Sequence, residues 1–562
     1  MGLRTLTSRA RVVASVAGLG SLIACGTAEP VPVAPVALVA RALSTCSGGG
    51  GDPFSEVNAV EVTVQDKDGG LLQNARTGLS GNQVNIGGVP EGEDRIVTIT
   101  GFVGDDARWF ARSTQVDVER GRDNPVNATF SRLGGFSCPQ TDAEFTHRLF
   151  PAVTALDGGF YLVSGGFTNV TPGATTAFTT TDGSKKAFIY DSQTGGLTRL
   201  ESAMTTARGA HTAVTVRGAT KSQVILIGGA TKMTFDPAAA NGFGWAFDIA
   251  DAHSSVDVFE WTTGESPASG AFLTDVQGVM VAKRVFATAA NISSDGLVLI
   301  CDGGPWGGAE PPEYAECDVF DGTAHAFLDN SYNFPRQYRA GGSVATIETG
   351  DVTRLLYVGG TKGRMVEIYR SSTEQRAGSG GTFTFPEGNY DDAPRTSFGS
   401  LTSLGNNRFA YIAGVRWNGS GFDQPSTDNA AILTVSESGA STTVEALPFG
   451  GLSVGRYFHT AGAPGVDRLT LLGGFTSGKT LDATGSVVQV QFDPGDPTLP
   501  IGLAPAPETE DAFGARAGAA SLLLANDTIL IAGGIGGTAD LETTAQGAFE
   551  IYTPSVVLPV AK

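Results

Sequence analysis

The sequence has few of the residues that most often bind metals or react covalently. Its 562 residues include only five cysteines and five histidines. No pair of cysteines has the C-x-x-C spacing of a metal site, and no two histidines lie two or four residues apart on one predicted element. The sequence therefore predicts no catalytic residue set, no metal site and no cofactor.

Positive charge is scarce as well. Lys and Arg number 37 against 57 Asp and Glu, which gives a formal net charge of −20, and no block of basic residues interrupts the chain. Binding to nucleic acid and adsorption to an anionic membrane surface are therefore not expected. Hydrophobic residues make up 41% of the chain, which is too high for a disordered protein. We expect a globular chain of mostly β structure.

Residues 1–24 have the order of an export signal peptide. Three arginines precede the apolar stretch 12–24, which is shorter than the ~20 residues that span a membrane. The stretch ends in Leu-Ile-Ala before Cys25 and resembles the lipobox of bacterial lipoproteins. The resemblance implies lipidation of Cys25 and, because Gly26 follows it, sorting to the outer membrane of the cell envelope. An ordinary secretory signal with a free Cys25 and a membrane-spanning anchor are the alternatives.

Two segments precede the main part of the chain. Residues 25–53 are rich in Pro, Ala and Gly, which predicts a tether, although the apolar stretch 36–43 could instead pack on the first domain or lie at the lipid surface. Residues 54–133 contain short alternating stretches separated by Gly and Asp turns. They predict a small β-sandwich, similar to Ig-like or transthyretin-like modules.

One pattern recurs seven times between residues 141 and 560. Its clearest copy, Arg208–Gly229, has a leading Arg, a strand, a polar turn and an apolar strand that ends in a glycine pair. A third strand with period-two alternation, such as FIYD or VEIY, and a weaker fourth strand follow each copy. The period of about 60 residues is typical of propellers and arrays. The leading arginines are Arg148, Arg208, Arg284, Arg336, Arg395, Arg456 and Arg516.

These marks resemble the kelch repeat, which combines an Arg-x-x-His start, a Gly-Gly strand end and a Tyr-Asp third strand. The resemblance covers residues 141–560 and implies an all-β fold, a seven-bladed kelch-like β-propeller. The kelch histidine is present at His211 and His459, where we expect a structural role on the inner strand.

The seven leading arginines are the candidate ligand-binding residues. They hold the same position in each blade, so they should gather at one end of the propeller, overhung by the long loops of the first two blades. A group of guanidiniums would suit a carboxylate, a sulfate or an acidic peptide. Alternatively, each Arg pairs with a nearby acid, such as Glu201 or Asp391, and braces adjacent blades. The sequence leaves both interpretations open.

Four cysteines remain if Cys25 carries lipid. Cys301 ends a second strand and Cys317 begins the third strand of the same blade, so antiparallel pairing predicts a disulfide between them. Cys46 and Cys138 then flank the small domain and form the second predicted disulfide. Free thiols or metal ligation are the alternatives.

These patterns lead to three competing functions. The first is a lipid-anchored, monomeric cell-envelope binding or scaffold protein whose propeller binds a protein or glycan ligand, an anionic one included. The second is a carbohydrate-active enzyme on the same fold, of the oxidase or sugar mutarotase type, because propellers host both classes. The third is a purely structural part of an assembly. The sequence does not identify the ligand.

Overall fold

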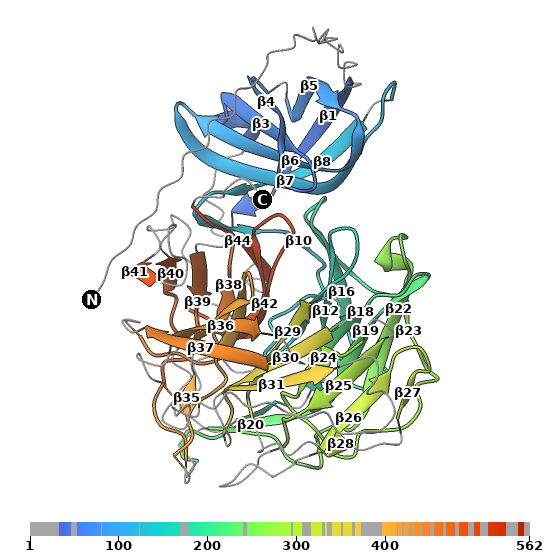
Figure 1. Ribbon diagram of the computed structural model, residues 1–562, viewed down its shortest axis with the longest axis vertical. Helices are drawn as coiled ribbons and strands as arrows, with labels where there is room; N and C mark the ends of the chain where they lie inside the picture. The colour runs from blue at the N-terminus through green and yellow to red at the C-terminus, as the bar shows by residue number, and fades with distance from the viewer. Residues whose placement is uncertain are drawn as a thin grey trace, which may run out of the picture.

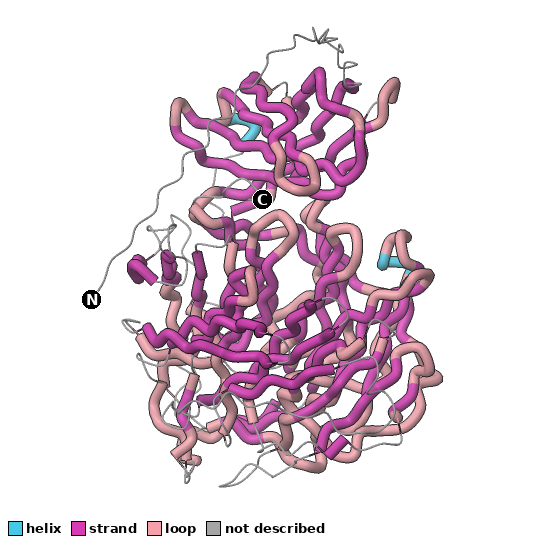
Figure 2. Tube along the Cα trace, viewed as in Figure 1, coloured by secondary structure: helices cyan, strands magenta, loops and turns pink. Residues whose placement is uncertain are grey.

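The computed structural model is almost entirely β (Figure 2). Its helical elements in the described residues are α1 (Pro53–Glu56) and one 3-10 turn, η1 (Pro267–Ser269). No helix in the part of the chain that the structure describes is long and apolar enough to cross a membrane. The described residues are 33–45, 53–79, 81–122, 124–168, 178–180, 182–239, 244–293, 296–305, 316–328, 332–333, 340–349, 352–361, 366–371, 396–412, 414–418, 421–425, 430–438, 441–449, 454–464, 468–477, 483–492, 500–505, 515–535 and 549–555.

The small domain is a β-sandwich built around one hydrophobic core. Its strands pair in the order β4-β3-β6-β7-β8-β1-β5. Strand β8 pairs with β1 over most of its length and with β7 only near its end, so β4-β3-β6-β7 and β5-β1-β8 enclose a common Val-rich core. The strands are β1 (Val33–Ala42), β3 (Ala59–Gln65), β4 (Leu71–Thr77), β5 (Gln83–Pro90), β6 (Gly92–Val103), β7 (Asp106–Val118) and β8 (Asn124–Arg132).

The first strand of this sandwich comes from the predicted tether. Strand β1 pairs antiparallel with β5 and parallel with β8, and Val36 is buried in the core. Of the two interpretations of residues 36–43, packing on the first domain is the one that the structure shows.

Most of the other described strands form seven main sheets in chain order, called sheets 1 to 7 here (Figure 1), and three smaller sheets of two or three strands lie in the loops. Their main strands run antiparallel, as the repeat predicts. Sheet 1 has β10 (Gln140–Thr141), β11 (Ala152–Ala155), β12 (Phe160–Ser164), β16 (Ala187–Asp191) and β17 (Gly196–Arg199); sheet 2 has β18 (Thr212–Val216), β19 (Lys221–Ile227), β22 (Val256–Thr262) and β23 (Ala271–Phe272); sheet 3 has β24 (Thr288–Asn291), β25 (Leu297–Cys301), β26 (Glu316–Asp321), β27 (Ala326–Phe327) and β28 (Tyr332–Asn333).

The later sheets follow the same plan. Sheet 4 has β29 (Ser343–Thr349), β30 (Val352–Val358) and β31 (Val366–Ser371); sheet 5 has β33 (Ser400–Gly405), β34 (Arg408–Ile412), β36 (Ala430–Ser438) and β37 (Ser441–Phe449); sheet 6 has β38 (Thr460–Gly462), β39 (Arg468–Leu472), β40 (Val487–Phe492) and β41 (Pro500–Pro505); sheet 7 has β42 (Ala517–Leu523), β43 (Ile529–Ile535), β44 (Phe549–Thr553), β9 (Gly135–Cys138) and β2 (Ser44–Thr45).

The sheets surround a common axis. The first repeat strand of each sheet contacts that of the next sheet, and β42 of sheet 7 contacts β11 of sheet 1. A separate hydrophobic cluster lies between each pair of neighbouring sheets. Both faces of a sheet are thus covered, which explains the unbroken apolar run before each glycine pair: Val224 and Leu226 face sheet 1, whereas Ile225 and Ile227 face sheet 3.

Sheet 7 is completed by strands from the other end of the chain. Strand β9 pairs with β44, and β2 pairs with β9. The sheet ring therefore includes residues N-terminal to the predicted boundary at residue 141. The sequence did not reveal this because Gly135–Cys138 lacks the marks of the repeat.

The small domain packs directly on sheets 1 and 7 (Figure 1). Arg112 of β7, whose side chain is fully buried, forms an ion pair with Asp527 in the turn between β42 and β43. The Thr129 hydroxyl of β8 donates to the Gln193 carbonyl at 2.8 Å. Leu43, which follows β1, is buried in the core between sheets 7 and 1.

Candidate functional site on the axis of the sheet ring

Five of the seven candidate arginines lie in the described residues, and all five are buried. Their exposed fractions are between 0 and 2%. In each, Nη1 donates to a backbone carbonyl near the end of the second strand of its own sheet. The guanidinium thus ties the start of one strand to the end of the next. The five are Arg148, Arg208, Arg284, Arg456 and Arg516, and Arg336 and Arg395 lie outside the described residues.

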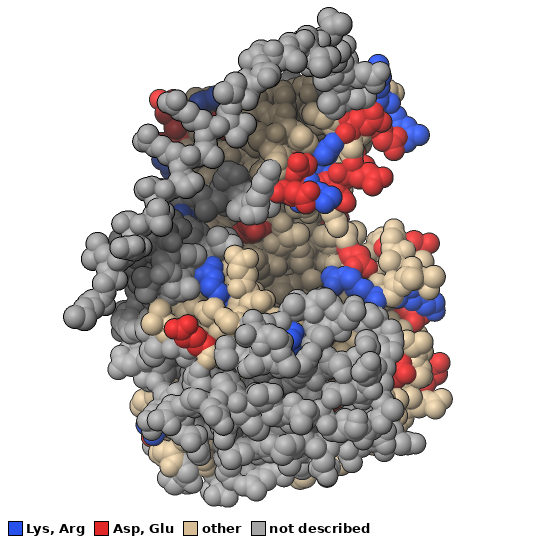
Figure 3. Space-filling model, in the orientation of Figure 1, with Lys and Arg blue, Asp and Glu red and all other residues tan. Residues whose placement is uncertain are grey.

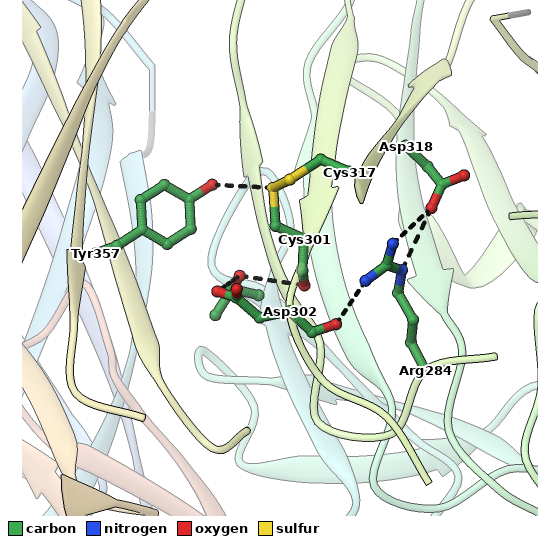
Figure 4. Close-up of a disulfide and its surroundings, with 7 residues drawn as sticks. Arg284, Cys301, Asp302, Cys317, Asp318 and Tyr357 are labelled. Carbon is green, nitrogen blue, oxygen red and sulfur yellow. Dashed lines mark hydrogen bonds and ion pairs between the residues drawn. A yellow bond between two sulfur atoms is a disulfide. The ribbon is translucent and has the colours of Figure 1, made fainter. Parts of the chain in front are cut away.

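Three of these arginines pair with an acid on the third strand of their own sheet. The Arg208–Asp257 distance is 2.5 Å, and the Arg284–Asp318 and Arg516–Glu550 distances are 3.0 Å. Figure 4 shows Arg284 between the Asp318 carboxylate and the Asp302 carbonyl. The signal for these partners was present in the sequence, as the acid at the second position of VDVFEW, CDVFD and FEIY.

The second carboxylate oxygen is used as well. Asp257 Oδ1 accepts from the Thr205 N–H at 2.8 Å, and Asp318 Oδ1 accepts from the Val281 N–H at 2.7 Å. Both donors lie three residues before the leading Arg. Each acid therefore holds both the guanidinium and the backbone segment that precedes the leading Arg.

The other two arginines have no carboxylate partner among the described residues. The Arg148 guanidinium lies over the rings of Phe145 and Phe188, at 4.4 and 4.9 Å. Arg456 donates to the Gly473 carbonyl at 2.9 Å and to the Ser486 hydroxyl at 2.8 Å. Burial lowers the pKa of both guanidiniums to about 10, so both stay charged at neutral pH.

The hypothesis of an anion-binding arginine pocket does not hold for these five residues. A ligand in solvent cannot reach a guanidinium that is at most 2% exposed. The bracing interpretation fits their geometry: Arg208, Arg284 and Arg516 pair with acids of the third strand and not with Glu201, whereas Asp391 lies outside the described residues. On the face drawn in Figure 3, the coloured Lys and Arg side chains are scattered and do not gather into one basic patch.

One residue from each sheet, which in five of the sheets lies two positions after the leading Arg, belongs to a ring around the axis. All seven have φ between 49° and 68°. Six N–H···O=C bonds of 2.8–2.9 Å link ring neighbours among the described residues; for example, the Ala210 N–H donates to Phe150, and the Phe150 N–H donates across the chain ends to Gly518. The ring residues are Phe150, Ala210, Phe286, Gly341, Phe398, Phe458 and Gly518.

This ring corrects the register of two repeats. Counting two residues back from Gly341 gives Arg339, not Arg336, and counting back from Phe398 gives Thr396, not Arg395. Thr396 is buried, and its carbonyl accepts from the Gly360 N–H at 2.6 Å, as the Arg208 carbonyl accepts from Gly166 at 2.9 Å. A hydrogen bond of 2.6 Å between the Thr396 and Tyr411 hydroxyls takes the place of the guanidinium contacts.

One end of the axis is closed by an aromatic lid. The long loops of sheets 1 and 2 pair as a small sheet of β14 (Phe178–Thr180), β20 (Met233–Phe235) and β21 (Trp245–Ala246). Trp245 is fully buried, lies 5.6 Å from the ring of Phe150, and donates its Nε1 to the Tyr457 hydroxyl of sheet 6 at 3.4 Å. The predicted overhang is therefore a packed layer, not an open mouth.

A cavity of about 240 Å³ lies on the axis where the first strands begin. Phe150, Phe286, Phe398 and Phe458 line it together with the residues that open each first strand, and none of the described lid residues does. The four rings contact one another at centroid distances of 4.5–5.6 Å and form an aromatic floor.

Two neutral histidines form part of the cavity wall. His211 Nε2 lies 2.9 Å from the Ser164 hydroxyl, and His459 Nε2 lies 2.8 Å from the Ser400 hydroxyl. Burial lowers the pKa of each imidazole to about 3, and the nearby guanidinium of Arg208 or Arg456 acts in the same direction. No Asp, Glu, Lys or Arg occurs among the described residues that line the cavity.

The cysteines take structural positions. Cys301 and Cys317 are joined by a disulfide between the second and third strands of sheet 3, and the Tyr357 hydroxyl of sheet 4 lies 3.8 Å from Cys301 Sγ (Figure 4). Cys138 on β9 is also disulfide-bonded. Its predicted partner Cys46 and the predicted lipidation site Cys25 lie outside the described residues. Within the described ranges, no group of three or more His, Cys, Asp or Glu residues could hold a metal ion.

Comparison with known proteins gives weak likenesses. No protein-family model matches the chain, and no curated protein matches it. Among solved structures, it is similar to a fungal alcohol oxidase of the AA5 family in complex with copper, with a TM-score of 0.43 and 16% identity over 73% of this chain and 75% of that one. It is also similar to YjhT, with a TM-score of 0.35 and 12% identity over 74% of this chain and 95% of that one. Neither likeness carries a conclusion about function.

Proposed function

We propose that sheets 1 to 7 are the blades of a closed, seven-bladed, kelch-like β-propeller. The contacts between successive first strands, the ring of N–H···O=C bonds and the hydrophobic clusters between neighbouring sheets support this proposal. Strands β9 and β44 come from opposite ends of the chain and pair in sheet 7, as ring closure requires. A closed propeller leaves only short, protected edge strands in its sheets.

The propeller belongs, in this proposal, to a lipid-anchored binding or scaffold protein of the bacterial cell envelope, with the outer membrane as its location. The lipobox-like sequence before Cys25 supports the anchor. The observation that carries the binding role is the axial cavity, which is walled by several sheets and closed at one end by the lid. The small sandwich acts as a spacer fixed to sheets 1 and 7 through Arg112 and Leu43.

The chemistry of the cavity favours binding over acid–base catalysis. A general acid or base works best when its pKa lies near the operating pH. The pKa of His211 and of His459 is lowered to about 3, so neither imidazole is a useful proton shuttle at neutral pH. Ser164 is fully buried beside His211 and cannot approach a substrate.

The anchor is tested by Cys25→Ser. We expect this variant to leave the membrane fraction and to enter the aqueous phase in a detergent partition, because lipid and not an apolar helix holds the mature chain. A variant that still sediments with membranes after a salt wash would exclude lipidation as the anchor.

The binding role is tested on the same soluble Cys25→Ser chain, which keeps β1 and β2. Pulldown from envelope extract and a glycan array should identify one specific partner that is bound without being converted. Product formation from a bound carbohydrate, or stoichiometric copper in the purified protein, would favour the carbohydrate-active enzyme instead.

A further inference from the structure

The floor of the axial cavity keeps aromatic side chains where the backbone disfavours them. Phe150, Phe286, Phe398 and Phe458 have φ between 49° and 62°. A left-handed conformation costs roughly 1–2 kcal/mol for a residue with a Cβ, and bulky residues with positive φ are outliers. Two other sheets place Gly at the same ring position, which carries no such cost. Strain of this kind points from an observed outlier to a functional hypothesis.

Two of the four aromatic residues are more exposed than the other two. Phe150 and Phe398 are 5% exposed and pack against Trp245 and Phe422 of the lid side. Phe286 and Phe458 are only partly buried, and both line the cavity. The centroids of their rings lie 5.3 Å apart, and the interplanar angle is 31°.

The wall above this floor is polar but uncharged. His211, His459 and Thr212 stand beside the backbone of the first strands. The guanidiniums of the leading arginines are sealed inside the sheets. An anionic ligand would therefore lose its hydration without gaining a counter-charge, which is strongly unfavourable.

The size of the cavity limits the ligand further. Its volume of about 240 Å³ is below the roughly 300–1,000 Å³ of pockets for drug-sized molecules. One six-membered ring with its substituents fits this space.

We infer that the axial cavity binds one uncharged, polyhydroxylated ring, a neutral sugar residue, with an apolar face on Phe286 and Phe458 and hydroxyls toward the uncharged polar wall. This inference rests on the proposed binding function and assigns its ligand class. An aromatic floor suits the C–H face of a sugar, and the polar wall suits its hydroxyls.

The first experiment measures affinity by calorimetry on the soluble Cys25→Ser chain. The probes are the methyl glycosides of glucose, galactose, mannose and N-acetylglucosamine. The affinity of each is compared with the affinities of glucuronate and galacturonate. At least one neutral glycoside should bind saturably, with the uronates at least about tenfold weaker. Affinity should not change from about pH 5 to about pH 8, because the described residues that line the cavity include no Asp, Glu, Lys or Arg and the pKa of both histidines is lowered to about 3. Uronates that bind as tightly, or a lack of saturable binding by every neutral glycoside, would overturn the inference.

The second experiment tests the floor. Phe458→Leu and Phe286→Leu keep an apolar side chain but remove the flat ring, and each should lower affinity by about tenfold. Phe475→Leu is the matched control, because Phe475 packs on Trp245 and Tyr457 in the same aromatic layer but does not line the cavity. Thermal melts establish that all three variants fold. An equal loss of affinity in the control would assign the rings a packing role only.

The outcomes separate the ligand class from the proposed function. Conversion of a bound neutral glycoside would refute the binding-protein function and leave the ligand class standing. A specific protein partner, together with no binding of any neutral glycoside, would support the binding-protein function and refute the ligand class.

Discussion

At the residue scale, the described leading arginines and the repeat histidines are buried, and they link strands and neighbouring sheets. Each described leading Arg crosslinks two strands of one sheet, and Ser164–His211 and Ser400–His459 link neighbouring sheets. Buried charge of this kind is tolerated only where partners are close. The buried ion pair between Arg208 and Asp257 leads to a direct test.

We expect Asp257→Ala to lower the free energy of unfolding by about 3–5 kcal/mol, because it leaves the Arg208 guanidinium buried without its carboxylate. Urea denaturation followed by fluorescence measures the loss. Glu144→Gln is the control: Glu144 also forms ion pairs, with Lys186 and Arg199, but these lie in solvent and the change should leave the midpoint where it is. Equal effects at the two sites would contradict the bracing role.

The two neutral histidines predict a pH dependence of stability. Because the folded pKa of each is about 3 and the unfolded value is about 6.5, the unfolded chain binds more protons between these values. Stability should therefore fall as the pH drops through this window, by about 1.4 kcal/mol per pH unit for each histidine. His211→Gln, which can still hydrogen-bond Ser164, should remove one such increment from the slope of unfolding free energy against pH. An unchanged slope would show that His211 titrates normally.

At the element scale, the glycine pair is explained by the approach of the next sheet. A Cβ on Gly228 would lie 2.3 Å from the Arg284 carbonyl oxygen, and φ at Gly228 is 60°. Sheet 3 departs from the predicted pair, because Asp302 takes the first position with φ of 56° and Gly303 takes the second. Asp tolerates this conformation better than most residues, and its carboxylate accepts from the Thr288 hydroxyl at 2.9 Å.

The disulfide of sheet 3 gives the test at this scale. The bond joins β25 to β26 across a sequence separation of 16 residues. The double variant Cys301→Ala/Cys317→Ala should therefore lose about 3 kcal/mol of stability. Peptide mapping without reductant should recover the crosslinked pair from the wild type. Wild-type stability that does not respond to reductant would argue against a formed bond.

At the scale of the whole molecule, closure of the ring depends on strands from both chain ends. Strand β44 pairs with β43 on one side and with β9 on the other. Removing it would separate β9 from the rest of sheet 7 and expose the cores that this sheet shares with its neighbours.

A chain truncated after Ile535 should unfold at a lower temperature and over a broader range, because cooperativity requires the closed circle. Calorimetry and limited proteolysis measure both effects. A chain that ends at Ser555 keeps every described strand and is the matched control. A truncated chain with the cooperative melt of the control would place β44 outside the ring.

The repeating elements could be read from neighbours in the sequence. Period-two alternation, polar turns and glycine pairs depend on residues close along the chain, and they predicted the all-β structure, the strand pairs around Gly228-Gly229 and the adjacency of Cys301 and Cys317. The acid of VDVFEW and CDVFD was also visible, although its pairing with the leading Arg was not recognised.

Only the tertiary structure decided what depends on segments far apart. The burial of Arg208, the contact of Trp245 with Tyr457 and the entry of β9 into sheet 7 arise from packing between distant residues, which leaves no local pattern. The register of sheets 4 and 5 was likewise set by the hydrogen-bonded ring, which selects Thr396 at a position where the nearest arginine had suggested Arg395. Strand periodicity depends on residues that are close along the chain. Burial and charge neutralisation depend on how the seven sheets pack against one another. The uncharged lining of the axial cavity also depends on this packing.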